Sequence, residues 1–395
     1  MSEPGATARQ VVILGGGVGG LSVAAALQEH FRREAAITVV DRAHSHVQGL
    51  SLLWLLRGWR SAAQVTVTPG GPAVKGLTML TAEVTGIDTE ARTVRTAGGD
   101  LRYDALVIAL GAELAPARLP GLPEALQSGI AGEFYTAQGA QRVHERLRSL
   151  ASGRLAFLVA AAPFKCPAAP YEGALLAADL LAETGARSKV AIDAFTPDAA
   201  PMPVAGAAVG AALVALLAER GIGFSPGRVA ERVDPGRLEL VFADGSTEPF
   251  DYAVVVPPHQ PPAVVAAAGL SPGGWATVSP ATLATSAEGV WALGDCSSVT
   301  LGNGKPLPKA AVFAKGQAAT VAAGVARYLG VDTEVPPFGG YGACYVEVGG
   351  GAAARGAGNF YHPGGPQVTL QPPSQEFHQE KEADEQSWLD RWDAG

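Results

Sequence analysis

The sequence predicts an α/β fold with two Rossmann-like domains and a small C-terminal region. Two separate series of buried strands alternating with helices predict the two domains. The first series begins with a glycine-rich turn, GGGVGG at residues 15–20, that joins a strand to a helix. A further apolar strand near residue 290 ends in an acidic residue, far from the first series along the chain.

The composition is that of a globular protein and narrows the function. The 395 residues are 48% hydrophobic and 17% charged, with a net charge of −8, and a chain of this length can bury more than one core. The negative charge and the lack of a basic stripe argue against a nucleic-acid partner. Three cysteines do not make a disulfide scaffold. Residues 1–10 lack a signal-peptide pattern and no apolar run reaches about 18 residues, so we expect neither secretion nor a spanning helix.

The N-terminal residues form a complete βαβ unit with a nucleotide-binding turn. Its parts are a strand at 11–14, a helix at 21–30 and a second strand at 37–41. Gly15, Gly17 and Gly20 have the spacing in which the first glycine allows the turn, the second admits a pyrophosphate and the third lets helix pack on strand. Asp41 ends the second strand, about 20 residues beyond the turn, where a carboxylate can accept from a ribose hydroxyl. The unit predicts a site for NAD or FAD.

Two later strands favour FAD in this first domain. The strand at 105–110 leads into Gly111, and the strand at 289–293 leads into Asp295. Both resemble flavin-binding segments of the FAD-dependent pyridine-nucleotide-disulfide oxidoreductase superfamily, which has a glutathione-reductase-like fold. The resemblance implies that Gly111 lies by the FAD diphosphate and that Asp295 holds the ribityl chain, and we count Arg42 among the cofactor-binding residues. The expected parts are the split FAD domain at 1–115 and 276–330, the second domain at 116–275, and the C-terminal region at 331–395.

The second domain is predicted to have a degenerate nucleotide site. Its first elements are a strand at 155–160, a helix at 171–183 and a strand at 189–195. The crossover after the first strand reads AAPFKCPAAPYE at 161–172, with three prolines and no glycine. Proline lacks a backbone donor and fixes φ, so we do not expect this loop to cradle a pyrophosphate. The pattern predicts that the NAD site is lost and that Cys166 stands in its place.

Cys166 is a candidate redox residue. The prolines around it restrict the loop and so fix the direction of its side chain. We expect the neighbouring Lys165 to lower the pKa of the thiol and to favour the nucleophilic thiolate. A lone cysteine after a strand is more often a small buried residue than a nucleophile. Here the proline-bracketed motif and the missing glycines favour function.

Segments spread over most of the chain carry a more specific resemblance. They are PFKCPAAPYE at 163–172, Gly294-Asp295, PLPK at 306–309, Gly316-Gln317 and GACY at 342–345. With them the chain resembles the sulfide:quinone oxidoreductases and the flavoprotein subunit of flavocytochrome c sulfide dehydrogenase. The resemblance implies that Cys166 and Cys344 meet beside the flavin as a disulfide or polysulfide bridge that sulfide opens. Such an exchange needs two thiols, because the departing sulfur must be a stable leaving group.

The same resemblance gives roles to two further residues. A glutamate at the position of Glu172 lies near the sulfur site, where it can shuttle a proton. A carboxylate in the first turn of a helix also stabilises that helix, and both interpretations stay open. Lys309 precedes a helix at 310–328 whose N-terminus is implied to point at the flavin and to stabilise its anionic reduced form. Cys296 is expected to be a packing residue.

Two departures from the family limit these implications. No cysteine precedes Cys166, so FAD is expected to be bound without a covalent link through cysteine. The tail at 377–392 is rich in acidic residues and poor in apolar ones, so membrane contact is expected to be peripheral at most. No ligand cluster suggests a metal site.

The resemblance therefore implies an FAD enzyme that oxidises sulfide, or a related sulfur compound, and reduces a quinone. The lack of a signal-peptide pattern favours a cytoplasmic location, peripheral to the membrane at most. Three alternatives stay open: transfer of electrons to a cytochrome c, a type II NADH dehydrogenase, and a flavin redox sensor without turnover. The missing glycine fingerprint in the second domain counts against the NADH dehydrogenase. A homodimer is compatible with the sequence, which does not fix the electron acceptor, the sulfur substrate or the oligomeric state.

Overall fold

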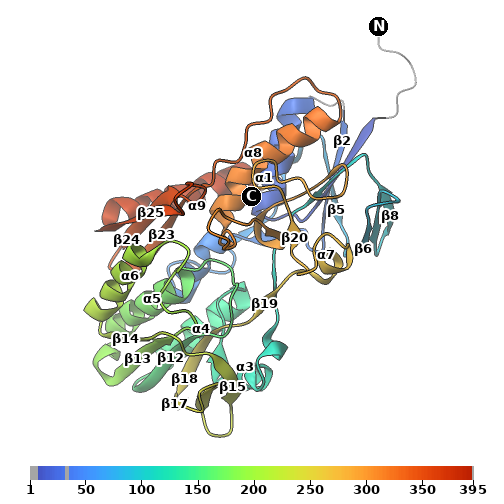
Figure 1. Cartoon of the computed structure of the whole chain (residues 1–395). Helices are drawn as coiled ribbons and strands as arrows, with labels where there is room; N and C mark the ends of the chain where they lie inside the picture. Colours follow the sequence, from blue (N-terminus) through green and yellow to red (C-terminus); the bar gives the residue numbers. More distant parts are fainter. Residues whose placement is uncertain (1–7, 32–34, 394–395) are drawn as a thin grey trace.

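Two sheets of five parallel strands form the framework of the fold (Figure 1). The computed structural model describes residues 8–31 and 35–393, so the expectation about a leader in residues 1–10 falls mostly outside the described part. The α/β fold with two Rossmann-like units that the sequence predicts is confirmed. Its strands read as continuous apolar runs because helices cover both faces of a parallel sheet.

The first sheet carries the glycine turn at the carboxyl end of its central strand. Its order is β21-β9-β1-β2-β5. The strands are β1 (Arg9–Leu14), β2 (Ala35–Asp41), β5 (Leu77–Thr81), β9 (Ala105–Ile108) and β21 (Val290–Ala292). Helices α1 (Val18–Phe31) and α8 (Ala311–Tyr328) pack against each other beside it. Because β21 pairs with β9, the sheet is completed only after the chain has passed through the second domain.

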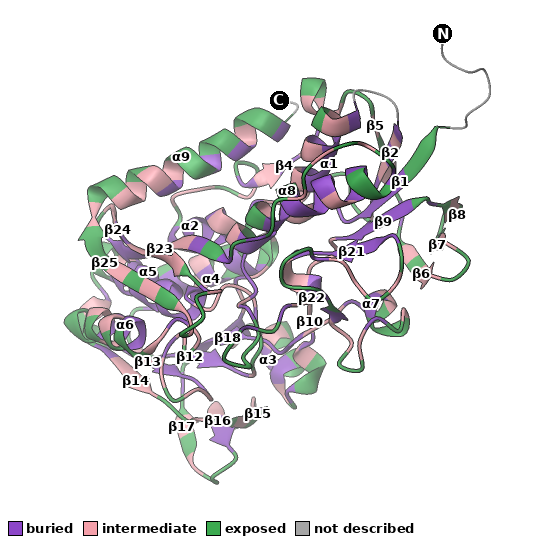
Figure 2. Cartoon of the chain, turned by 45° about the horizontal axis from the view of Figure 1, so that its top comes forward, coloured by how far each residue is buried: buried purple, intermediate pink, exposed green. Residues whose placement is uncertain are grey.

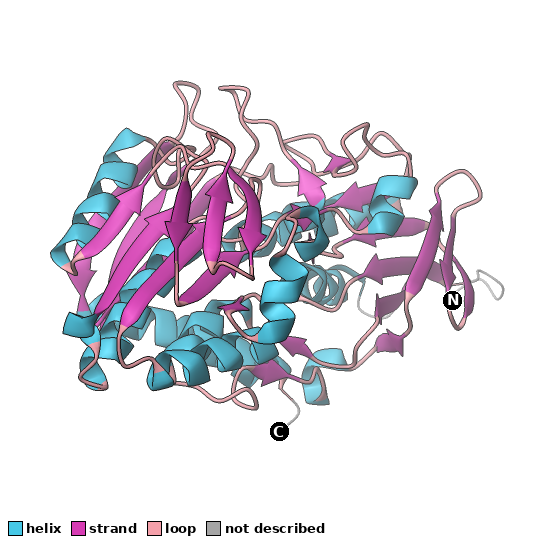
Figure 3. Cartoon of the chain, turned by 90° about the horizontal axis from the view of Figure 1, so that it is seen from below, coloured by secondary structure: helices cyan, strands magenta, loops and turns pink. Residues whose placement is uncertain are grey.

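The second sheet lies in the lower half of Figure 1, and Figure 3 views the molecule from that side. Its order is β11-β18-β12-β13-β14. The strands are β11 (Ala131–Gly132), β12 (Gly153–Val159), β13 (Val190–Phe195), β14 (Ile222–Ser225) and β18 (Tyr252–Val256). The helices around it are α2 (Leu52–Arg57), α4 (Ala137–Ser149), α5 (Ala169–Glu183) and α6 (Ala207–Glu219). The apolar run of α2 packs on α4 and α5.

The C-terminal region forms an antiparallel sheet and a long helix. These elements are β23 (Tyr341–Gly349), β24 (Ala352–Asn359), β25 (Gln367–Ser374) and α9 (Gln375–Trp392). The Ser374 hydroxyl caps α9 by accepting from the backbone N–H of Phe377. The buried positions of α9 follow a helical period, which turns one face inward although the segment is acidic overall. They are Lys381, Glu385, Trp388 and Trp392, and Figure 2 shows the rest of the helix on the outside.

Short elements complete the described part of the chain. The helices are α3 (Leu122–Ser128) and α7 (Ala263–Ala267). The strands are β3 (His46–Val47), β4 (Thr66–Val67), β6 (Val84–Asp88), β7 (Thr93–Thr96), β8 (Gly99–Arg102), β10 (Glu113–Leu114), β15 (Ala230–Asp234), β16 (Glu239–Phe242), β17 (Thr247–Pro249), β19 (His259–Gln260), β20 (Ala276–Thr277) and β22 (Ser297–Ser298). Among the residues described, no helix combines the length and the apolar character that crossing a membrane requires.

Candidate active site

The glycine turn after β1 is shaped so that only glycine fits at two of its positions. Gly15 has φ +103°, and a Cβ there would lie 2.3 Å from the carbonyl oxygen of Ala109. A Cβ on Gly20 would lie 1.9 Å from the carbonyl oxygen of Gly15, where α1 approaches the turn. A Cβ on Gly17 would meet no protein atom within 4 Å, so this backbone is open to an incoming group. The turn therefore matches the cradle that a pyrophosphate needs.

Asp41 is placed at the end of β2, beside the glycine turn. Its Oδ2 accepts from the N–H of Gly16 at 2.6 Å, and its Oδ1 accepts from the N–H of Ala43 at 2.9 Å. The carboxylate thus fixes the turn, and its remaining lone pairs are available to a ribose hydroxyl. Arg42 follows it and is exposed. Burial lowers the pKa of Lys165, and the charge of Arg42 adds to that shift.

Asp295 supplies an independent observation that fits a flavin cofactor. Its Oδ1 is buried without a hydrogen-bond partner, although a buried carboxylate oxygen nearly always has one. Burial raises the pKa of this carboxyl group, against the opposing charges of Lys165 and Lys309. Gly111, with φ +70°, leaves the space next to it open. An orphaned acceptor lining a cavity, near an open glycine turn, is what a bound polyol chain with hydroxyl donors would satisfy.

The cavity that Asp295 lines has a volume of about 410 Å³ and a mostly apolar wall. Segments from every part of the chain meet there. The segment at 48–53, including the first residues of α2, forms one wall, and the start of α8 forms another. Its polar lining consists of Gln48, Tyr135, Lys165, Cys166, Glu172, Asp295, Lys315, Cys344, Tyr345, Lys381 and Asp384.

Cys166 is held at this cavity by its backbone. Its N–H donates to the carbonyl oxygen of Lys309 at 2.7 Å, and its φ of +52° is a conformation that a side chain rarely adopts. Such strained residues cluster at functional sites. The prediction that Lys165 lowers the thiol pKa is wrong. Burial raises that pKa, Cys344 and Glu172 raise it further, and the cation that opposes them is Lys381.

Cys344 reaches the same cavity from the middle of β23. Burial raises the pKa of its thiol to about 11, and the carboxylate of Glu172 contributes in the same direction. Both cavity cysteines are free thiols, as is Cys296. Cys296 lies in the core, where its Sγ donates to the carbonyl oxygens of Ile108 and Leu293, each at 3.3 Å.

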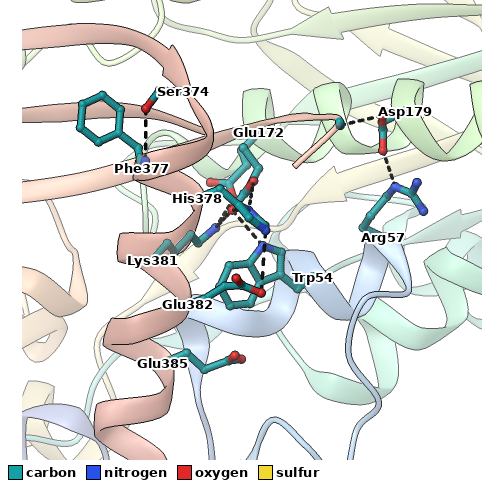
Figure 4. Close-up of polar contacts among 12 residues, drawn as sticks. Trp54, Arg57, Glu172, Asp179, Ser374, Phe377, His378, Lys381, Glu382 and Glu385 are labelled. Atoms are coloured by element: carbon teal, nitrogen blue, oxygen red, sulfur yellow. Dashed lines mark hydrogen bonds and ion pairs between the residues drawn. The ribbon is translucent and has the colours of Figure 1, made fainter. Parts of the chain in front are cut away.

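Glu172 is buried at 3% exposure and its partner comes from α9 (Figure 4). The Nζ of Lys381 donates to Glu172 Oε1 at 2.6 Å and lies 3.6 Å from Glu347 Oε1. Burial raises the pKa of the Glu172 carboxyl group, and Lys381 opposes that shift. Helix stabilisation alone does not explain Glu172, since its carboxylate is paired across the cavity wall.

Lys381 and Glu347 are site residues that the sequence analysis missed. Lys381 stands in a mostly polar segment, whereas Glu347 stands between Val346 and Val348. Charged side chains are seldom fully buried, so neither residue was expected in the interior. The helical period of Lys381, Glu385, Trp388 and Trp392 is the one available signal, and it requires knowing that the tail is a helix.

Lys309 is turned toward backbone acceptors. Its Nζ donates to the carbonyl oxygens of Asp295 at 2.7 Å and Ser297 at 3.2 Å, and it lies 3.5 Å from the centre of the Trp275 ring. Burial lowers the pKa of its ammonium to about 8. The residue therefore ties the start of α8 to the segment that carries Asp295. Among the described residues no group of three or more His, Cys, Asp or Glu side chains forms a metal cluster.

The sequence of this chain matches known protein families and curated relatives. A family model described as pyridine nucleotide-disulphide oxidoreductase matches residues 9–160, and one described as the central part of the sulfide dehydrogenase (flavocytochrome c) flavoprotein chain matches residues 140–200. The mitochondrial sulfide:quinone oxidoreductase of Dictyostelium discoideum is 30% identical over 73% of this chain and 66% of its own length. The sulfide-quinone reductase of Aquifex aeolicus is 28% identical over 66% of this chain and 61% of its own length.

The fold agrees over a longer stretch. The crystal structure of the Aquifex aeolicus sulfide:quinone oxidoreductase superposes with a TM-score of 0.85 at 24% identity, covering 97% of this chain and 91% of that one. The matched parts of the two curated sequences named above are slightly less than two thirds of their length. The glycine turn, the orphaned Asp295 oxygen and these matches together show a flavoprotein whose residues 9–160 match the pyridine nucleotide-disulphide oxidoreductases and whose chain is similar to the sulfide:quinone oxidoreductases.

Proposed function

We propose that the protein oxidises sulfide at Cys166 and Cys344 and passes the electron pair through non-covalent FAD to a quinone. The observation that carries the proposal is the convergence of two thiols from remote segments on one cavity, together with the orphaned oxygen of Asp295. FAD, when bound, supplies the two-electron acceptor next to the sulfurs. Gly15, Gly17, Gly20, Gly111, Asp41, Arg42, Asp295 and Lys309 are the residues proposed to hold it.

The sulfur chemistry balances when the two cysteines start as a disulfide. Hydrogen sulfide ion attacks one sulfur, so a new S–S bond forms, the bond between the cysteines breaks, and the other cysteine leaves as a thiolate. The persulfide then carries one proton, which the buried Glu172 is placed to accept. The deprotonated persulfide then bonds to the released cysteine sulfur, which re-forms the bridge with one additional sulfur, and the electron pair of that cysteine thiolate passes to FAD when FAD is bound. Burial raises the pKa of both cysteine thiols, and the charge of Lys381 opposes that shift and so favours the leaving thiolate.

The decisive experiment is anaerobic mixing of the oxidised protein with sulfide. The flavin absorbance near 450 nm should bleach in the parent, and it should persist in Cys166→Ser and Cys344→Ser although both variants keep FAD. Cys296→Ser is the matched control, because Cys296 lies in the core and should leave bleaching intact. Bleaching of both cavity variants at the parental rate would overturn the proposal.

A cytochrome acceptor is the second candidate, because residues 140–200 match the central part of a flavocytochrome c sulfide dehydrogenase chain. The two candidates separate when the sulfide-reduced protein is mixed with a short-chain quinone or with cytochrome c. Rapid reoxidation by quinone supports the first candidate. Rapid reoxidation by cytochrome c alone supports the second.

Location and assembly stay predictions. A quinone with a long tail resides in the bilayer, so an acceptor of this class favours peripheral membrane contact of an otherwise cytoplasmic protein. Flotation with lipid vesicles tests that contact, and sedimentation velocity tests the homodimer.

A further inference from the structure

A row of buried polar side chains leads from the cysteine cavity to the protein surface along α9. Glu172 and Lys381 line the cavity, and their contact measures 2.6 Å. Lys381 Nζ lies 3.6 Å from Oε1 of Glu347, whose side chain is fully buried. His378 Nδ1 lies 3.0 Å from both oxygens of Glu347. Figure 4 shows the side chains from α9 turned toward Glu172 and Trp54.

The outer end of this row opens into a second cavity. It has a volume of about 400 Å³ and is lined by Trp59, Arg60, Gly351, His378 and Glu382. The His378 side chain is 17% exposed, and its Nε2 lies 3.8 Å from Glu382. The ring stands edge-on to the indoles of Trp54 and Trp59 at 5.9 and 5.5 Å. His378 is therefore held in place, with one nitrogen facing the interior and the other facing the opening.

With both carboxylates ionised and Lys381 protonated, the row has a net charge of −1, which one additional proton would neutralise. Glu172 and Glu347 bring two negative charges when ionised, and Lys381 brings one positive charge. The Trp54 Nε1–H donates to Glu347 at 2.9 Å but adds no charge. A proton on either carboxylate or on His378 makes the group neutral, and a buried group is stabilised by neutrality. At the outer end, Arg60 lies between two carboxylates, with its Nη2 3.3 Å from Glu382 and 2.8 Å from Glu385.

Turnover needs a path of this kind. If the proposed function holds, every hydrogen sulfide ion that becomes a persulfide leaves one proton inside an apolar cavity. A proton trapped beside Cys166 and Cys344 would keep the next thiolate from forming. Histidine is suited to exchange that proton with water, since its ordinary pKa lies near neutral pH.

We propose that Glu172, Lys381, Glu347 and His378 form a proton relay that connects the cysteine cavity to the opening at Trp59 and Arg60. Glu172 takes the proton at the cavity. Lys381 receives it as it gives one of its own to Glu347, and His378 passes it to water. This inference rests on the proposed function for the source of the proton but not for the path itself.

The test uses the holoenzyme and His378→Gln, which keeps a hydrogen-bonding side chain next to Glu347 but cannot carry a proton. In weakly buffered solution at neutral pH, sulfide-driven bleaching should slow by about a hundredfold or more, since a positioned acid–base group typically contributes about 10²–10⁴-fold. Added imidazole should restore the rate, since it can enter the outer cavity. His362→Gln is the control and should bleach like the parent, because this histidine is exposed in the loop between β24 and β25 and its Nδ1 accepts from the N–H of Gly364.

A second variant places the break inside the protein. Glu347→Gln can still accept from Trp54 but cannot take a proton, and imidazole cannot reach it. It should show the same slowing without rescue. A purely structural effect of either substitution would not depend on the buffer or on imidazole.

A second readout does not need sulfide to be the substrate. Methyl methanethiosulfonate converts each reduced thiol to a mixed disulfide, releasing methanesulfinate and one proton. At saturating reagent the labelling rate of Cys166 and Cys344 reaches a plateau set by proton loss, which His378→Gln should lower while the rate at low reagent stays unchanged. If sulfide never bleaches the parent but this plateau falls, the proposed function fails and the relay stands. If the plateau is parental in both variants, the relay is overturned.

Discussion

At the scale of single residues, the site depends on a glycine position that has no space for a side chain and on a buried oxygen that has no hydrogen-bond donor. Gly20 has no space for a methyl group, because the carbonyl oxygen of Gly15 would lie 1.9 Å away. Gly17 has space but is expected to need it for the cofactor. The buried Oδ1 of Asp295 has no hydrogen-bond donor within the protein, so it can accept a hydrogen bond from a bound ligand.

The two glycines make a matched pair of substitutions. Gly20→Ala should lower the free energy of unfolding by about 1–3 kcal/mol or more, because helix and turn must move apart. Gly17→Ala should leave the stability of the apoprotein unchanged and weaken FAD binding. Thermal unfolding of the apoproteins and fluorescence titration with FAD measure the two effects. Unaltered FAD affinity in Gly17→Ala would contradict the assigned pyrophosphate position.

The raised thiol pKa of Cys344 gives a pH prediction. A raised pKa means that the thiol is protonated at neutral pH, so the reactive thiolate is scarce there and grows as pH rises. Alkylation of the reduced protein by iodoacetamide should accelerate about tenfold for each pH unit, as titration below a pKa requires, and should level off only toward pH about 11. Mass spectrometry of the peptide that contains Cys344 follows the rate. Saturation by pH 9 would show an ordinary thiol.

At the scale of elements, α9 is what closes the site. Its inner face places Lys381 against Glu172, and its Trp388 and Trp392 pack with Leu21 and Ala25 of α1. On the outer side Lys315 of α8 pairs with Asp384 of α9 at 2.8 Å. One helix thus contacts both the flavin-binding domain and the second domain.

These two lysines should differ sharply in what they contribute to stability. Lys381→Met removes a cation that is 2% exposed between two carboxylates, and leaving a buried charge unpaired costs about 3–5 kcal/mol. Lys315→Ala breaks a pair whose side chains are 30% and 47% exposed, which costs at most about 1 kcal/mol. Urea unfolding compares the two variants. Adding Glu172→Gln to Lys381→Met should recover part of the loss, and no recovery would argue against direct pairing.

At the scale of the whole molecule, the second domain retains the shape of a nucleotide-binding unit without its glycine loop. The segment at 161–172 instead delivers Cys166 to the cavity and begins α5, which carries Glu172. NADH should therefore fail to bleach the flavin at concentrations where sulfide bleaches it fully. Stopped-flow mixing with NADH under anaerobic conditions checks this, and fast bleaching would restore the NADH dehydrogenase alternative.

Much of the fold could be predicted from local patterns, whereas part of the site could not. Strands such as β1 and β12 are continuous apolar runs, and the glycine spacing after β1 has one common structural meaning. The residues 341–392 offered no comparable signal, because β25 and α9 are largely polar and are held by tertiary contacts. The pairing of Glu172 with Lys381 joins residues that are distant in sequence. Lys165 misled because adjacency in sequence does not place its charge near the thiol.

The late return of β21 to the first sheet has a consequence for synthesis. In the finished sheet β9 is flanked by β1 and β21, so β9 remains an outer strand until residues 290–292 have left the ribosome. A nascent chain must protect that apolar edge while the intervening domain is translated, because an exposed edge invites pairing with other chains. The flavin pocket cannot assemble before β21 has been synthesised. FAD should therefore bind only when the last third of the polypeptide has left the ribosome.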